Sequence, residues 1–522
     1  MRWERDSQQA YCSINGKRLL KALDEIRVLT VSNEDWNEKY RIPEYVSLSM
    51  LTDEVMKEES DYDAVFVSRV PSVEETEYLK RVVRAYTLFI IDSTELSFTV
   101  KELFRMRKGL FFPELGVQGF FDHEIRNFHQ MNRGEKINPQ NFIVSTGFSG
   151  NVTWKGYSEV ELDGDFGEQY HQIAYWKNTI PISRGQSLDM FLEFTKSDDV
   201  MLILSVTQYR AGQVAQFEQR WDFDKERLKE VFCIDNLNAN GNLFISLKAK
   251  GRGKISIKGL HSRSSRRGYG FFIPGGEIYK TSSGEEVFCY FEPGDMKPPL
   301  NVYFAGYKKR EGFEGYNLMR KLGCPFLLLS ESRLEGGCFY MGDKEYEDLV
   351  KKIIRKYMDE LEFEGNDVIL SGMSMGTTGA LYYSPDIRPK AVIIGKPLAS
   401  IGDVATAELY YRPGGFPTSL DALYHIAGDT DEEAVKRLND KLWDKFSAAD
   451  YSDTVFVISY MIEDDYDRYA HDRLIEHLNS AGAKVYSRGL HGRHKDNTSG
   501  IVYWFAERYK QIIRDEFTRT VV

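Results

Sequence analysis

The first part of the chain alternates short apolar runs with amphipathic stretches. Apolar runs of strand length and helix-like spacings of apolar residues follow one another at 26–31, 64–67, 72–83, 88–91 and 100–107. Strands that alternate with helices in this way are typical of βαβ units built on a small parallel sheet. Residues 30–34, after the first predicted strand, contain no glycine and so lack a nucleotide-phosphate loop. We therefore predict a small α/β (βαβ) domain over residues 1–135, with a structural or docking role.

From about residue 140 the pattern changes to short strands with alternating apolar and polar positions. Turn residues separate the predicted strands at 151–154, 158–162, 172–176, 188–194, 201–206, 242–247 and 254–257. Such regular spacing predicts an antiparallel β-sandwich, here over residues 140–268. Its aromatic residues fill a core in one interpretation, and stack on sugars as in a carbohydrate-binding module in the other. The candidates for stacking are Trp154, Tyr157, Tyr170, Tyr175 and Trp176.

The last part returns to apolar strands that alternate with helical patterns. Strands are predicted at 300–305, 326–330, 367–371, 391–395, 454–460 and 484–488. This succession predicts an open, mostly parallel sheet with right-handed crossovers over residues 270–522. The stretch 398–451 is too long for a simple crossover and contains a helical pattern at 431–446. We expect this stretch to form a cap over an active site.

One motif within residues 270–522 has the pattern of a catalytic serine. Residues 367–379 form a predicted buried strand that runs into a tight turn, with Ser374 inside the sequence G-M-S-M-G. A serine on a strained turn from strand to helix needs small residues on both sides, and Gly372 and Gly376 supply them. The pattern G-x-S-x-G also arises by chance, so its weight depends on the residues that come later in the chain.

An acid and a histidine come after Ser374 in the order that an α/β-hydrolase sheet requires. The acidic loop after the predicted strand 454–460 offers three candidates for the acid, and the loop after 484–488 offers two for the base. We predict a triad of Ser374, Asp464 and His494. The alternatives are Glu463 and Asp465 for the acid and His491 for the base.

This set of residues predicts acyl-transfer or ester chemistry. A serine hydroxyl is a poor nucleophile at neutral pH, so a histidine must accept its proton, and the acid orients that histidine. The oxyanion that forms next needs backbone N–H donors. One is expected from Met375, and the other from the loop after an early strand, where Gly306 and Tyr307 lie.

Length and charge narrow the class of protein. The 522 residues suffice for about three domains, and 42% hydrophobic with 28% charged residues is ordinary for a globular protein. The net charge of −11 argues against nucleic acid as a partner and against an anionic membrane surface.

Cysteine usage and apolar runs indicate the compartment. The five cysteines, Cys12 among them, form no C-x-x-C pair, which fits a reducing compartment and implies no metal site. No coenzyme or nucleotide motif is present, so we predict no cofactor. The first residues lack an apolar signal segment, and the longest apolar runs have strand length. We therefore expect a cytoplasmic protein with no integral membrane segment.

Three stretches carry a resemblance to a known family. The chain resembles the Asp family of accessory Sec-system proteins in residues 369–383, 463–467 and 492–497. The first of these stretches continues the turn around Ser374 as M-G-T-T-G-A-L-Y-Y. Within that family the chain looks like the second Asp component, which has a serine-hydrolase fold. The resemblance covers the full length of the chain.

The resemblance implies a function that the motifs alone do not reach. It implies a protein of a Gram-positive bacterium that O-acetylates N-acetylglucosamine on a serine-rich-repeat glycoprotein adhesin and assists its export. It further implies assembly with the other two Asp components and cooperation with a SecA-type motor, peripherally at the membrane translocase. Ser374, Asp464 and His494 match the family's nucleophile, acid and base. The alternatives are a carboxylesterase or deacetylase of the same fold, and a non-catalytic export chaperone or scaffold.

Overall fold

The computed structural model describes residues 25–520, except for residues 59, 96, 130, 131, 133, 213–216 and 237. Cys12 and the first part of the predicted domain 1–135 therefore lie outside the described residues. The chain divides into two compact units. The first comprises residues up to 132 with 266–276 and 292–296, and the second comprises the rest. Each unit is described by itself.

The first unit is built on a five-stranded parallel sheet in the order β2-β1-β3-β4-β5. Its strands are β1 (Ile26–Val31), β2 (Val46–Met50), β3 (Ala64–Val67), β4 (Leu88–Ile91) and β5 (Leu110–Phe112). Its helical segments are α2 (Trp36–Lys39), η1 (Val55–Lys57), α3 (Val73–Val82), α4 (Phe98–Met106), η2 (Glu114–Gly116), α5 (Val117–Gly119), η3 (Phe120–Glu124) and η4 (Ile125–Phe128). The parallel sheet confirms the βαβ prediction, whereas β2 and β5 were not predicted.

Alternation of buried side chains explains how this sheet packs on both faces. Leu29 and Val31 of β1 join a core cluster with α3 and α4, whereas Ile26 and Val28 join a second cluster with α2 and η3. Successive side chains of a strand point to opposite faces, so one strand serves both cores. The aromatic-rich segment after β5 contributes Phe120, Phe121 and Phe128 to the second cluster.

The second unit begins with two antiparallel sheets, as the strand pattern predicts. Their strands are β6 (Gly134–Ile137), β7 (Phe142–Val144), β8 (Asn151–Lys155), β9 (Glu159–Asp165), β10 (His171–Trp176), β11 (Ile180–Ile182), β12 (Ser187–Lys196), β13 (Met201–Arg210), β14 (Phe217–Asp224), β15 (Phe232–Asp235), β16 (Gly241–Lys250) and β17 (Arg252–Ser264), with η5 (Pro139–Asn141) and η6 (Arg227–Lys229) between strands. One sheet has the order β14-β13-β16-β10-β7, and the other β15-β12-β17-β6, which is extended by the short strand β21 (Arg310–Glu311). A single apolar core draws on strands of both sheets.

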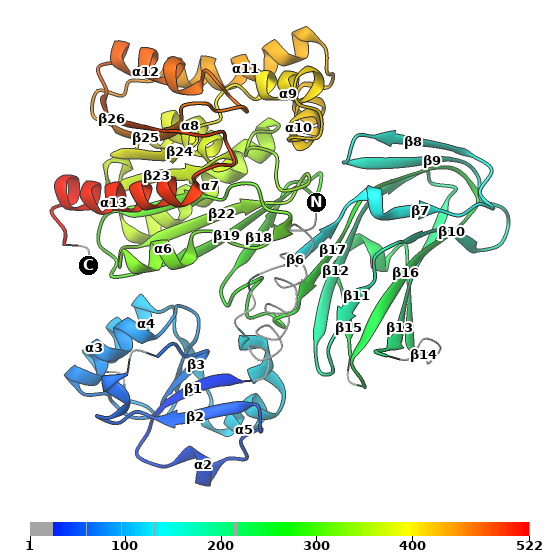
Figure 1. Cartoon of the computed structure of the whole chain (residues 1–522). Coiled ribbons are helices and arrows are strands. Elements are labelled where there is room, and N and C mark those ends of the chain that lie inside the picture. Colours follow the sequence, from blue (N-terminus) through cyan, green and yellow to red (C-terminus); the bar gives the residue numbers. More distant parts are fainter. Residues whose placement is uncertain are drawn as a thin grey trace, which may run out of the picture. The chain divides into compact units, whose positions relative to one another are not determined.

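The C-terminal sheet has eight strands in the order β18-β19-β22-β20-β23-β24-β25-β26 (Figure 1). They are β18 (Glu277–Lys280), β19 (Glu286–Glu292), β20 (Leu300–Phe304), β22 (Phe326–Glu331), β23 (Val368–Met373), β24 (Ala391–Gly395), β25 (Val455–Met461) and β26 (Lys484–Leu490). The six strands from β22 to β26 in this order pair in parallel. Because β18 and β19 are antiparallel, the sheet is mixed. The hairpin β18–β19 was not predicted.

Helices connect the parallel strands of this sheet. They are α6 (Tyr316–Lys321), α7 (Lys344–Leu361), η7 (Gly365–Asp367), α8 (Met375–Ile387), α9 (Ile401–Tyr410), α10 (Thr418–Ala427), α11 (Glu432–Ser447), α12 (Ala470–Ser480) and α13 (Thr498–Phe517). Figure 1 shows α9, α10 and α11 gathered together, and these three helices pack against one another. They occupy the stretch 398–451 that the sequence analysis predicts as a cap. Nowhere in the described part of the chain is a helix both long and apolar enough to cross a membrane.

The sandwich and the C-terminal sheet are joined within the second unit. Strand β21 (Arg310–Glu311), from the loop after β20, pairs with β6 of the sandwich. A buried ion network lies beside this junction. Arg263 donates to both carboxylate oxygens of Glu311, at 2.7 and 2.9 Å, and His261 contacts Glu311 at 2.6 Å. The division into separate domains at 140–268 and 270–522 stays a prediction, because both parts share one compact unit.

Candidate active site

Ser374 lies in a strained turn between β23 and α8. Its φ of 52° and ψ of −122° are unusual for a residue with a side chain. Tight packing enforces this turn: a Cβ atom on Gly376 would lie 2.0 Å from the Phe304 carbonyl oxygen. A Cβ on Gly372 would lie 2.4 Å from the Gly376 carbonyl oxygen. Both positions therefore require glycine, for the steric reason that the motif predicts.

The structure brings Ser374, His494 and Asp464 into one hydrogen-bonded series. The Ser374 Oγ atom lies 2.8 Å from His494 Nε2, and His494 Nδ1 lies 2.8 Å from Asp464 Oδ2. A carboxylate accepts only, so Nδ1 donates to Asp464 and Nε2 is left to accept the serine proton. His494 is 4% exposed and Asp464 is 8% exposed, so little solvent competes for these contacts.

The neighbouring acids and the second histidine have other contacts. Glu463 accepts from the Gly492 N–H and pairs with His491 at 2.9 Å, at an exposed position. Asp465 accepts from the His494 N–H at 3.0 Å and pairs with Arg412 at 2.7 Å. Burial alone would raise the pKa of Asp465, but these two contacts outweigh it and lower the pKa. Asp464 is thus the acid that reaches the ring of His494.

A buried lysine that sequence analysis missed holds the histidine loop. Lys396 follows β24 directly, has a φ of 56° and is 5% exposed. Its ammonium donates to the His494 carbonyl at 2.6 Å, the Asp496 carbonyl at 2.8 Å and the Thr498 hydroxyl at 3.0 Å. Burial lowers the pKa of Lys396. A charged residue immediately after a fully apolar strand is the only signal of this role in the sequence.

An aromatic stack supports the face of the His494 imidazole. The rings of His494 and Tyr466 lie 4.2 Å apart and nearly parallel, at 5°. Two residues of the segment between α9 and α10 contact Tyr466 in turn. The Arg412 guanidinium lies 3.8 Å from the centre of the Tyr466 ring, and the Phe416 ring stacks on it at 5.2 Å. The predicted cap therefore contacts the residues that hold the base.

A buried carboxyl group ties the start of the cap to the acidic loop. Asp467 accepts from the backbone N–H groups of Ala399 and Ser400 at 2.8 and 2.7 Å. Burial raises the pKa of Asp467 to about 7, against the opposing effect of these two donors. The protonation state of Asp467 therefore changes near neutral pH.

The predicted oxyanion donors differ in their surroundings. Met375 is the first residue of α8, and the first N–H groups of a helix lack partners within it. The Gly306 N–H, by contrast, donates to Glu314 at 2.6 Å, so the prediction of a free donor at Gly306 is wrong for this structure. Gly306 still allows the close approach expected of it, since a Cβ there would lie 3.0 Å from the Met373 carbonyl oxygen. The Tyr307 N–H stays a predicted donor.

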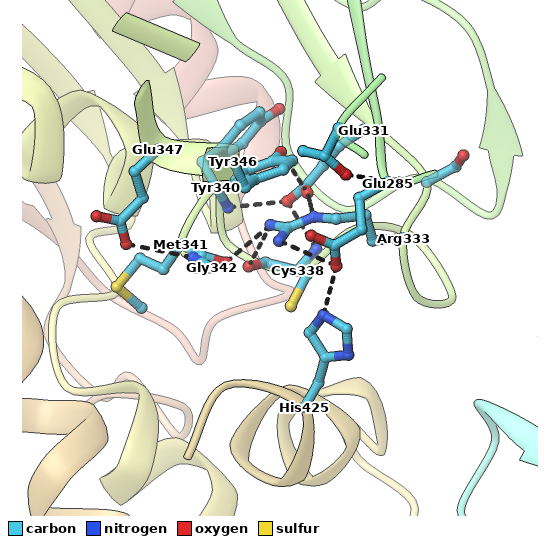
Figure 2. Close-up of polar contacts among 12 residues, drawn as sticks. Glu285, Glu331, Arg333, Cys338, Tyr340, Met341, Gly342, Tyr346, Glu347 and His425 are labelled. Atoms are coloured by element: carbon cyan, nitrogen blue, oxygen red, sulfur yellow. Dashed lines mark hydrogen bonds and ion pairs between the residues drawn. The ribbon is translucent and has the colours of Figure 1, made fainter. Parts of the chain in front are cut away.

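A second buried cluster, around Glu331 and Arg333, holds the loop that follows β22 (Figure 2). Glu331, at the end of β22, accepts from the backbone N–H groups of Cys338 and Tyr340 at 2.7 and 2.8 Å. Arg333 donates to Glu331 at 2.5 Å and covers the ring of Tyr346 at 3.4 Å. A Cβ on Gly337 of this loop would lie 2.7 Å from Met375 Sδ. The cluster therefore holds the backbone of the loop at Cys338 and Tyr340, and Gly337 of this loop leaves room for the Met375 side chain.

One group of side chains has the spacing of a metal site, away from the triad. The ligand atoms of His261, Glu286 and Glu311 lie within 4.8 Å of one another, and all three residues are buried. The guanidinium of Arg263 already contacts both Glu286 and Glu311. Because Arg263 and Lys280, whose ammonium lies 2.9 Å from Glu286, balance the two carboxylates, we assign no metal to the group.

Sheet and site together define a class of protein. A serine after β23, an acid after β25 and a histidine after β26 follow the chain order of α/β-hydrolases, and the C-terminal sheet resembles theirs. The family described as the accessory Sec system GspB-transporter, which is the second of the Asp components, matches residues 26–519. The chain belongs to this family.

Relatives and a solved structure agree with this assignment. The chain is 40% identical to the second Asp protein of the accessory Sec system of Streptococcus gordonii over 386 residues, which are 74% of this chain and 76% of that protein. It is 38% identical to the corresponding Asp protein of Staphylococcus aureus (strain NCTC 8325 / PS 47), over 74% of each. A chain of the Glycosylation Associate Protein (Gap123) complex from Streptococcus agalactiae matches with a TM-score of 0.83 and 31% identity, over 95% of this chain and 99% of that one.

Proposed function

We propose that this chain is a serine-dependent O-acetyltransferase of the accessory Sec system. Its substrate would be N-acetylglucosamine on a serine-rich-repeat glycoprotein adhesin, whose export it would also assist. The observation that carries the catalytic part is the series Ser374, His494 and Asp464, with 2.8 Å at both contacts. Membership in the accessory Sec system GspB-transporter family supports the part in export.

The proposed reaction proceeds through an acyl-enzyme. Ser374 Oγ attacks the acetyl carbonyl of a donor while His494 Nε2 takes the hydroxyl proton. The tetrahedral oxyanion is stabilised by the Met375 N–H and the Tyr307 N–H. His494 then gives its proton to the leaving group of the donor. In the second half a sugar hydroxyl loses its proton to His494 and attacks the acetyl-serine, which regenerates the Ser374 hydroxyl and releases the O-acetylated sugar.

Transfer to a sugar requires that water compete poorly for the acetyl-serine. Phe416 and Arg412, both on the segment between α9 and α10, cover Tyr466 beside the catalytic imidazole. The stacked rings of Phe416 and Tyr466 place apolar surface beside the imidazole, which would lower the access of water to the site. This arrangement favours transfer over hydrolysis, whereas a carboxylesterase or deacetylase would need an open path for water.

The test uses Ser374→Ala in the producing bacterium, with the alanine enzyme checked for normal thermal unfolding. We expect mass spectrometry of the adhesin glycans to show loss of O-acetyl groups. Unchanged acetyl content in a strain that makes the folded variant would sink the proposal. The matched control is Ser371→Ala, which removes a buried serine hydroxyl of the same strand that contacts the Val302 carbonyl rather than His494.

Two further measurements separate the rival functions. Purified enzyme given an acetyl ester and an N-acetylglucosamine acceptor should form more O-acetyl sugar than free acetate; the reverse ratio would indicate an esterase or deacetylase.

Export of the adhesin is scored separately in the Ser374→Ala strain and in a deletion strain. Export that is lost only on deletion would assign transport to a scaffold role, together with the other two Asp components and the SecA-type motor.

A further inference from the structure

A hollow on the outer face of one sandwich sheet is unrelated to the triad. It has a volume of about 850 Å³ and lies over β10, β13 and β16. Two of its aromatic side chains are unusually open to solvent: Tyr175 is 41% exposed and Phe244 is 49% exposed. Exposed rings that gather at a hollow mark a binding surface more often than rings scattered singly.

Strand pairing sets the order of side chains across this face. Ser246 of β16 lies opposite Tyr175 of β10, while Phe244, two positions before it, lies opposite Thr207 of β13. Tyr209 lies opposite Asn242 in the next outward-facing row. Rings and small neutral polar side chains therefore alternate over the surface, because residues two apart on a strand share a face.

The rings are held by each other rather than by the protein core. Tyr209 and Phe244 form an edge-to-face pair with centroids 5.2 Å apart and an interplanar angle of 78°. Trp176, which the sequence analysis also offered for stacking, is instead buried and packs on Phe142 at 5.0 Å. That part of the prediction is wrong, and Tyr175 is the predicted stacking residue that lines the hollow with an exposed ring.

The hollow offers hydrogen bonds but little net charge. Its polar lining consists mainly of hydroxyl and amide side chains, on Gln172, Thr207, Asn242 and Ser246. Arg210 also lines it, but its guanidinium pairs with Glu218 at 2.8 Å. A charged ligand would therefore find no uncompensated partner among these side chains, whereas a neutral polyhydroxyl ligand would find both donors and acceptors.

We propose that this face is an oligosaccharide-binding site for neutral sugars. The C–H face of a pyranose ring packs against the exposed faces of Tyr175 and Phe244, and its hydroxyls bond to Asn242, Thr207 and Ser246. A protein partner is less suited, because polar side chains interrupt the apolar surface between the rings. The site lies on a sheet that contributes nothing to the triad, so it binds glycan independently of catalysis.

The test measures binding of N-acetylglucosamine trimer to the full chain by isothermal titration calorimetry, with maltotriose as a second neutral probe. The choice of the first probe rests on the proposed function. Tyr175→Ala and Phe244→Ala should each weaken binding about tenfold, because each removes one stacking ring. Trp154→Ala, an equally open aromatic on β8 of the other sheet, is the matched control and should bind as the wild type does.

Several outcomes would overturn the proposal. They are no binding of either trisaccharide by the wild type, equal loss in Trp154→Ala, or unchanged affinity in both ring variants. Asn242→Ala serves as a second variant in case a ring variant unfolds, and should also bind more weakly. Ser374→Ala should bind the trisaccharide normally. Loss of acetylation in Ser374→Ala without any binding at this face would leave the proposed function standing and refute only this site.

Discussion

Replacement of Lys396 by methionine tests whether the Lys396 ammonium positions the loop that carries His494. The change keeps the length of the side chain and removes its ammonium. Three acceptors then lose their donor: the carbonyls of His494 and Asp496 and the hydroxyl of Thr498. The triad residues themselves are untouched. We expect His494 to lose its fixed position while the sheet around β24 stays folded.

The size of the effect follows from the three hydrogen bonds. A hydrogen bond to a charged group contributes about 1.5–3 kcal/mol, but one ammonium serves all three acceptors and its own burial is costly. A net loss of about 2–4 kcal/mol is therefore a reasonable range. If this loss falls on the position of His494, kcat drops by about 30- to 1,000-fold, since about 1.4 kcal/mol corresponds to a factor of ten.

The assay is the release of nitrophenol from p-nitrophenyl acetate, which reports formation of the acetyl-enzyme. Lys396→Met should lower kcat far more than it raises KM, since the lysine contacts the loop and not the substrate. Lys390→Met, which removes a surface lysine paired with Glu516, is the control and should retain normal kcat. A folded Lys396→Met enzyme within twofold of the wild type would refute the reasoning.

Three further substitutions test other parts of the site. Asp464→Asn should lower kcat by about 10³- to 10⁴-fold, whereas Asp465→Asn should have a much smaller effect; equal losses would contradict the assignment of the acid. Asp467 has a folded-state pKa raised to about 7, above that of the unfolded chain, so its protonated form stabilises the fold at low pH and this contribution is lost as the pH rises to 7. Urea unfolding should therefore show the stability of the wild type relative to Asp467→Asn falling between pH 4 and 7, by up to about 1.4 kcal/mol per pH unit, and a difference independent of pH would disprove this. Gly376→Ala should abolish folded, active protein because its Cβ would lie 2.0 Å from a carbonyl oxygen, whereas Gly147→Ala, with open space around it, should behave as the wild type in thermal unfolding and activity.

Most strands with a run of buried apolar residues could be predicted, although the fully buried β19 was not. The runs 26–31, 64–67 and 88–91 coincide with β1, β3 and β4, because a central strand of a parallel sheet is apolar on both faces. Of the edge strands of the first unit's sheet and of the C-terminal sheet, β26 was predicted, whereas β2, β5 and β18 were not. Strand β5 covers only Leu110–Phe112 and has exposed side chains, so its sequence carries no burial pattern. The pairing of β21 with β6 depends on tertiary contact and has no local signal at all.

In the candidate site, too, features set by neighbouring residues in the sequence could be predicted, whereas contacts between distant segments could not. The tight turn at Ser374 could be predicted because it requires glycine at the two nearby positions, Gly372 and Gly376, where a Cβ atom would clash with the backbone. Asp464 was the predicted acid, but the sequence could not exclude Glu463 and Asp465, since the assignment depends on which carboxylate faces His494 after two loops meet. Glu314 was missed for a related reason: nothing near Gly306 in the sequence indicates that its N–H would be taken by a carboxylate eight residues later.

Under the proposed mechanism, the predicted cap supports the base as well as covering the site. Arg412 pairs with Asp465, whose other oxygen accepts from the His494 N–H, and the same guanidinium lies over Tyr466, which stacks on the imidazole. One cap residue thus supports the base through two independent routes. A displacement of the cap would remove both supports at once while Ser374 and Asp464 keep their places on the sheet. Under the proposed mechanism, the position of this segment would therefore affect both the orientation of His494 and the access of water to it.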